Sequence, residues 1–111
     1  MWGSKPEWID EADVRTRAGA AYDRCFCPEG RARQLEAIRR SGSRGDLLTM
    51  LHVPTLVLHG SRDTLVDPSG GRRTAELVPG ARYVEIDGMG HDFPRAVWNR
   101  FVDEWCELAR G

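Results

Sequence analysis

A chain of 111 residues is long enough for one domain, and its formal net charge of -1 gives no excess of positive charge for binding nucleic acid. Hydrophobic residues make up 41% of the chain and charged residues 30%, which excludes a disordered protein and is typical of a globular one. The N-terminal residues lack the pattern of a signal peptide and no segment is apolar enough to span a membrane, so we expect a cytoplasmic protein without a membrane partner.

The first 45 residues are predicted to form a helical segment. Asp10 is a suitable N-cap for a helix that runs to about Arg24, and Pro28 suits the first turn of a second helix that runs to about Arg40. Residues 41–45 then interrupt the helical pattern. The apolar positions at helical spacing are Val14, Ala18, Ala21 and Tyr22 in the first helix, and Ala32, Leu35 and Ile38 in the second.

The cysteines of the chain predict neither disulfides nor a structural metal site. Cys25, Cys27 and Cys106 are odd in number, and their spacing matches no zinc-binding pattern. The pair around Phe26 is a weak indication of metal ligation, and ordinary packing explains it better. We therefore expect reduced thiols, as in a reducing compartment.

Residues 46–111 are predicted to form a βαβα unit. A short helical piece near Leu47–Leu51 leads to a continuous aliphatic run, Thr55–His59, which is typical of a parallel strand covered on both faces. Asp67 and Pro68 predict the cap and first turn of the following helix. Residues 82–87 then alternate between apolar and polar positions, as an edge strand does.

The last helix has the clearest amphipathic pattern and is expected to lie on a sheet. Its apolar positions at helical spacing are Trp98, Phe101, Val102, Trp105, Leu108 and Ala109. Two parallel strands cannot bury so much apolar surface alone, because a parallel sheet needs cover on both faces and partners at both edges. The sequence therefore predicts part of a larger α/β domain.

Two predicted loops carry the residues with catalytic potential. Asp63 follows the first strand and His91 the second, and open α/β sheets place their ligands and catalytic groups at the carboxyl ends of strands. Gly88 and Gly90 allow a sharp turn that lets His91 project from the strand end. A histidine held by a carboxylate can take a proton from a nucleophile while the carboxylate fixes its tautomer.

The chain resembles the C-terminal part of an α/β-hydrolase, and among these the bacterial aclacinomycin methylesterase group. The resemblance extends over about residues 20–110. The residues that carry it are Pro54-Thr55-Leu56-Val57-Leu58-His59-Gly60, Asp63, Pro79-Gly80-Ala81-Arg82 and Gly88-Met89-Gly90-His91-Asp92. The resemblance implies a partial α/β-hydrolase fold made of the last two parallel strands with flanking helices. The stretch from Ala21–Arg24 through Gln34–Ile38 resembles the end of the cap region of that group, so the helical segment 1–45 is assigned to it.

The same resemblance implies that Asp63 and His91 are the acid and base of a catalytic triad, in the chain order nucleophile, acid, histidine. Thr64 departs from the family, which usually has proline at this position. The larger departure is that we find no strand-Gly-x-Ser-x-Gly-helix segment and no oxyanion loop in the chain. Ser43 has a similar local spacing, but an amphipathic helix precedes it where the nucleophile motif needs a strand.

Other polar residues near the predicted site are expected to be structural. Asp67 is the rival acid, but its place before Pro68 favours helix capping. His59 is expected to be packed and hydrogen-bonded, His52 has no evident partner in the sequence, and Asp92 is expected at most to orient the His91 loop.

The implied activity is hydrolysis of a small-molecule carboxylic ester without a metal or organic cofactor, and the chain is expected to be inactive alone. Dehalogenases, epoxide hydrolases and carbon-carbon hydrolases share the same acid and histidine, so the substrate stays open. A complementing N-terminal half or self-association is the expected partner. The alternative is a non-catalytic interaction module, in which the unpaired sheet edges and the uncovered apolar face bind another chain or a second copy.

Overall fold

The computed structural model describes residues 3–111, which divide into two compact units. One unit is the segment Asp10–Arg44, which contains two helices. Helix α1 (Glu11–Arg24) begins where the Asp10 carboxylate accepts a hydrogen bond from the backbone N–H of Asp13, at 3.0 Å. Helix α2 (Pro28–Ser41) begins at a proline. Both helices were predicted at these places.

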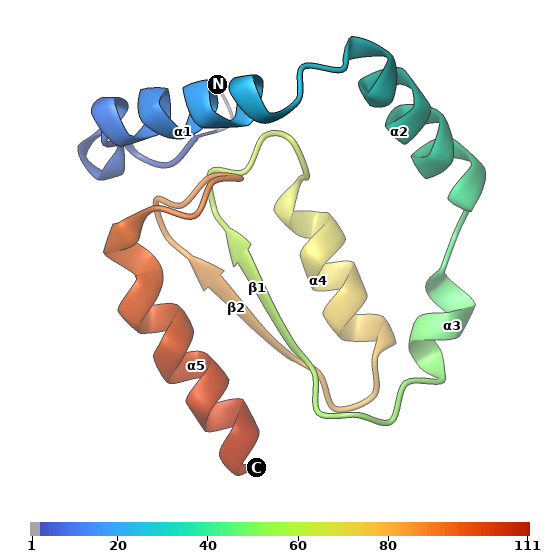
Figure 1. Cartoon of the computed structure of the whole chain (residues 1–111). Helices are drawn as coiled ribbons and strands as arrows, with labels where there is room; N and C mark the ends of the chain where they lie inside the picture. Colours follow the sequence, from blue (N-terminus) through green and yellow to red (C-terminus); the bar gives the residue numbers. More distant parts are fainter. Residues whose placement is uncertain (1–2) are drawn as a thin grey trace. The chain divides into compact units, whose positions relative to one another are not determined.

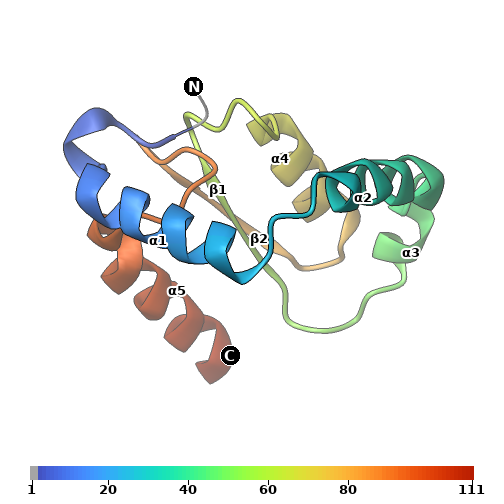
Figure 2. The ribbon, with the colours of Figure 1, turned by 45° about the horizontal axis from the view of Figure 1, so that its top comes forward.

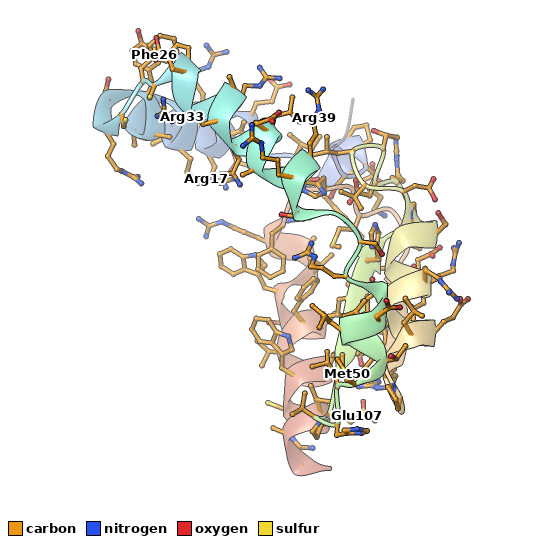
Figure 3. All side chains as sticks on the ribbon, turned by 90° about the vertical axis from the view of Figure 1, so that its right-hand side faces the viewer. Arg17, Phe26, Arg33, Arg39, Met50 and Glu107 are labelled. Atoms are coloured by element: carbon orange, nitrogen blue, oxygen red, sulfur yellow. The ribbon has the colours of Figure 1, made fainter. Side chains whose placement is uncertain are left out.

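The unit Asp10–Arg44 has no buried residue in either helix. The rings of Tyr22 and Phe26 lie 4.8 Å apart but remain exposed, and so do Arg33 and Arg39 on α2 (Figure 3). The apolar faces predicted for these helices therefore do not form a core within the unit.

The second unit contains residues 3–9 and 45–111 and is built around two parallel strands (Figure 1). Strand β1 (Leu56–Gly60) pairs with β2 (Arg82–Ile86), with Leu56 opposite Arg82 and Gly60 opposite Ile86. Helix α4 (Pro68–Leu77) connects the strands, and the Asp67 side chain accepts from the Ser69 N–H at 2.9 Å. The short helix α3 (Gly45–Thr49) precedes β1 and lies two residues earlier than predicted.

Helices α4 and α5 (Trp98–Arg110) lie on opposite faces of the two strands (Figures 1 and 2). On the α4 side, Gly71 approaches the rings of His59 and Tyr83 so closely that a Cβ would overlap His59. On the α5 side, a small core forms from three buried residues and four partly buried ones. These are Ile86, Met89 and Val97, with Trp8, Leu58, Val84 and Phe101 packed against them.

Helix α5 leaves much of its apolar face exposed, in line with the expectation that two parallel strands cannot bury it. Phe101 packs against the core, whereas Trp98 is 43% exposed and Trp105 is 56% exposed. Burial of α5 depends on what covers the helix from outside the two strands, and a periodic pattern does not reveal this. The ring of Phe101 lies 4.4 Å from that of Phe93, which precedes the helix, and 6.1 Å from that of Trp105.

The described residues thus form helices and two parallel strands, a mixed α/β arrangement that is compatible with part of an α/β fold. Short 3-10 turns occur at Pro6–Trp8 and Arg95–Val97. Residues 3–9 belong to the same compact unit as residues 45–111. Within 3–111, no helix has the length and apolar character needed to cross a membrane.

Candidate functional site

The loops after β1 and β2 are held together by backbone hydrogen bonds. The N–H of Ser61 donates to the Ile86 carbonyl at 3.1 Å, and the N–H of Arg62 donates to the Met89 carbonyl at 2.8 Å. Gly60 makes this approach possible, because a Cβ at this position would overlap the Met89 carbonyl group. The sequence places Asp63 on one of these loops and His91 on the other, so the backbone pairing brings the two residues to the same edge of the sheet.

Asp63 is 7% exposed, and both oxygens of its carboxylate have hydrogen-bond partners. One oxygen accepts hydrogen bonds from the backbone N–H groups of Leu65 and Val66, at 3.0 and 2.9 Å. The other oxygen, Oδ2, lies 2.8 Å from Nδ1 of His91. The contact between acid and histidine that the sequence predicts is therefore present.

Burial alone raises the pKa of Asp63, because it disfavours the charged carboxylate. Hydrogen bonds from Val66, His91 and Leu65 together outweigh burial and hold the pKa of Asp63 below its ordinary value. The carboxylate is therefore ionised near neutral pH and can only accept hydrogen bonds, so Nδ1 of His91 carries the proton between them.

His91 combines a fixed nitrogen with an accessible ring. Its side chain is 39% exposed, and because Nδ1 contacts Asp63, the other nitrogen, Nε2, lies on the side of the ring away from the carboxylate. Asp63 and His91 both line an open cavity of about 330 Å³, which extends along the α5 side of β1 to Leu58 and Phe101. A reacting group bound in this cavity would be near the histidine ring.

His59 lies behind the acid and is a packed, hydrogen-bonded residue, as predicted. Its Nε2 donates to the carbonyl of Val66 at 2.8 Å and lies 3.5 Å from Oδ2 of Asp63. Because Val66 also donates its N–H to Asp63, His59 closes the turn that surrounds the carboxylate.

The other candidates from the sequence occupy structural positions. Asp67 caps α4 and is exposed, so it is not the partner of His91. Ser43 follows helix α2, not a strand, and His52 is exposed between α3 and β1. The three cysteines are reduced and exposed, and no group of three potential metal ligands occurs in the described part of the chain.

Sequence reasoning missed two serines that bind the His91 loop. Ser61 Oγ accepts from the Gly88 N–H at 2.9 Å, and Ser4 Oγ accepts from the Gly90 N–H at 3.0 Å. Ser4 lies 86 residues from Gly90 in the sequence, and no periodic pattern or motif links them. The one signal available in the sequence is the Gly-rich loop itself, whose backbone N–H groups need hydrogen-bond partners when they are buried.

No family model matches the chain. Over 68 residues the chain is 42% identical to rhodomycin D methylesterase DauP of Streptomyces sp. (strain C5), and equally to rhodomycin D methylesterase DnrP of Streptomyces peucetius. The match covers 61% of this chain but 23% of either relative, so the chain spans about a quarter of the length of these curated relatives. The similarity supports the resemblance to esterases that was inferred from the residues around Asp63 and His91.

Proposed function

We propose that this chain contributes the acid and base of a carboxylic ester hydrolase, with Asp63 and His91 in these roles. The observation that carries the proposal is the 2.8 Å contact between Nδ1 of His91 and the buried Asp63 carboxylate. The similarity to two methylesterases favours a methyl ester of a small-molecule carboxylic acid as the substrate class.

In the proposed reaction, a serine hydroxyl attacks the ester carbonyl while Nε2 of His91 takes the hydroxyl proton. Asp63 holds the ring in the required tautomer and stabilises the imidazolium that forms. His91 then returns the proton to the alcohol as it leaves, and a water molecule activated by His91 hydrolyses the acyl-enzyme to give the acid. The serine and the oxyanion donors would come from a polypeptide segment other than residues 3–111.

A chimera tests this proposal. Residues 45–111 replace the homologous segment of DauP, and hydrolysis of a methyl ester is measured. Activity that is lost in His91→Ala supports the proposal, whereas a folded chimera that keeps the contact of His91 with Asp63 but shows no turnover refutes it. The chain alone is expected to show no turnover of short-chain aryl esters, because a positioned base needs a nucleophile and an oxyanion hole.

The second candidate function is a non-catalytic interaction module. The observation that favours it is the exposure of Trp98, Val102 and Trp105 on one helix, α5. Size-exclusion chromatography with light scattering measures whether these side chains hold copies of the chain together. A dimer that the variant Trp105→Ser dissociates would support the module, and a monomer at all concentrations would count against self-association.

A further inference from the structure

The segment that contains Ser4 lies directly on the His91 loop. The Ser4 backbone N–H and its hydroxyl both donate to Oδ1 of Asp92, at 2.6 and 2.9 Å. The hydroxyl oxygen also accepts from the Gly90 N–H at 3.0 Å, and the neighbouring Lys5 N–H donates to the Gly88 carbonyl at 2.7 Å. Ser4 is 3% exposed and its bond with the Gly90 N–H is buried, whereas Asp92 is exposed and its bonds with Ser4 are partly buried.

Ser4 contacts the residues on both sides of His91. Gly90 precedes the histidine and Asp92 follows it, and a single hydroxyl group binds both. Gly88 in this loop adopts a φ of +80°, which glycine reaches without strain, and the backbone of a glycine-rich loop has more conformational freedom than that of other residues. Fixing the backbone before and after His91 limits the positions that its ring can take relative to Asp63.

The hydroxyl of Ser4 uses its one proton on Asp92. In this arrangement the hydroxyl does not offer its proton to His91, so Ser4 is not the nucleophile that His91 would activate, although its segment packs against the His91 loop. Its chemistry is that of a bridge between a backbone amide and a carboxylate.

We propose that Ser4 and Asp92 are positioning residues that hold the His91 ring against Asp63. The effect on catalysis rests on the proposed function, but the positioning itself is measurable in the chain alone. Its signature is the Nδ1 proton of His91, which lies in the 2.8 Å contact with Asp63 and is expected to exchange slowly with water for that reason.

Ser61 provides a matched control. Its hydroxyl also joins a glycine N–H to an aspartate, accepting from Gly88 at 2.9 Å and donating to Asp87 at 3.2 Å. It binds the beginning of the same loop but neither residue adjacent to His91. A comparison of Ser4→Ala with Ser61→Ala therefore distinguishes an effect on the loop as a whole from an effect on the position of the His91 ring.

The test is NMR of the full chain with isotope-labelled histidine, in wild type and in Ser4→Ala, Asp92→Ala, Asp92→Asn and Ser61→Ala. We expect the exchange rate of the His91 Nδ1 proton to rise about tenfold in Ser4→Ala and Asp92→Ala, the equivalent of one lost hydrogen bond. Asp92→Asn keeps an oxygen that accepts from Ser4, so exchange should remain near the wild-type rate. In Ser61→Ala the exchange rate of the His91 Nδ1 proton should stay within about twofold of the wild-type rate.

Backbone amide exchange of Leu58 and Val84 in the two strands is followed in the same samples. A Ser4→Ala variant in which these amides exchange faster by the same factor as the His91 proton would show general unfolding and overturn the proposal. An unchanged His91 proton in Ser4→Ala would overturn it too, and so would equal effects of Ser4→Ala and Ser61→Ala. Since no step of this test requires a nucleophile or a substrate, its failure is distinct from failure of the esterase proposal.

Discussion

Arg82 at the start of β2 and Glu104 in the middle of α5 form an ion pair of 2.7 Å. The side chain of Glu104 is only 8% exposed. Arg100, one helical turn before Glu104, donates to the second carboxylate oxygen at 2.7 Å. Hydrogen bonds from Arg100 lower the pKa of Glu104 most, burial opposes this, and Arg82 lowers the pKa further. The pair attaches the last helix to the sheet.

The variant Glu104→Gln should reduce the stability of the folded chain, because it leaves two guanidinium groups facing a neutral amide. Urea unfolding followed by circular dichroism measures the loss. Glu107→Gln is the control, since Glu107 also contacts Arg82, at 3.2 Å, but with a side chain that is 69% exposed. Equal losses of unfolding free energy in the two variants would mean that burial of the Glu104 carboxylate does not increase its contribution to stability.

Replacing Asp63 with a neutral side chain of the same shape should reduce turnover while the fold of the site is kept. In the DauP chimera proposed above, Asp63→Asn should lower kcat by about 10⁴-fold, the effect of removing the charge of a triad acid so that the histidine adopts the wrong tautomer. Asp67→Asn is the matched control, because Asp67 only caps α4 and is exposed. A larger effect of Asp67→Asn than of Asp63→Asn would reverse the assignment of the acid.

Ionisation of Asp63 should make the fold sensitive to acid. The pKa of Asp63 lies below its ordinary value of about 3.9, so ionised Asp63 stabilises the folded chain above this value. This contribution is lost as the pH falls through the lowered pKa of the folded state. Between pH 5 and pH 3, the wild type should therefore lose more unfolding free energy than Asp63→Asn, as measured by urea unfolding. Parallel losses would show that another carboxyl group causes the acid sensitivity.

Local chemistry explains which parts of the fold were predictable. Asp10 and Asp67 have the side chains that cap helices, and both cap the helices predicted for them. The contact of Asp63 with His91 followed from a general property of parallel sheets, namely that successive strands end at the same edge. In each case the information lies within a short segment or in the order of the elements.

The remaining features depend on contacts that a local pattern does not encode. Ser4 and Asp92 are 88 residues apart, and a serine in a segment without periodicity gives no sign of its partner. The exposure of Trp98 and Trp105 likewise depends on what lies against α5, while the sequence records only that one face is apolar. Contacts between segments that are distant in the sequence thus account for the missed residue, and they also determine how much of α5 is buried.

Gly60 gives the most direct test of how the two loops are assembled. A Cβ at this position would overlap the Met89 carbonyl group and lie 2.6 Å from the carbonyl oxygen of Gly90, and both are backbone atoms that no side-chain movement can displace. Gly60→Ala should therefore separate the loops, lengthen the contact of Asp63 with His91 and cost about 1–3 kcal/mol of unfolding free energy. Loss of the protected His91 Nδ1 proton in NMR spectra is the local measurement, and urea unfolding is the global one.

Gly19 is the control for this substitution, because it lies inside helix α1 and a Cβ added there would meet nothing within 4 Å. Alanine is the better helix former, so Gly19→Ala should increase helicity and stabilise α1 by about 1 kcal/mol, leaving the His91 proton unchanged. The same change from glycine to alanine is thus expected to have opposite signs at the two positions. If Gly60→Ala were as well tolerated as Gly19→Ala, with the His91 proton still protected, the close approach of the strand ends could not be what places the acid beside the histidine.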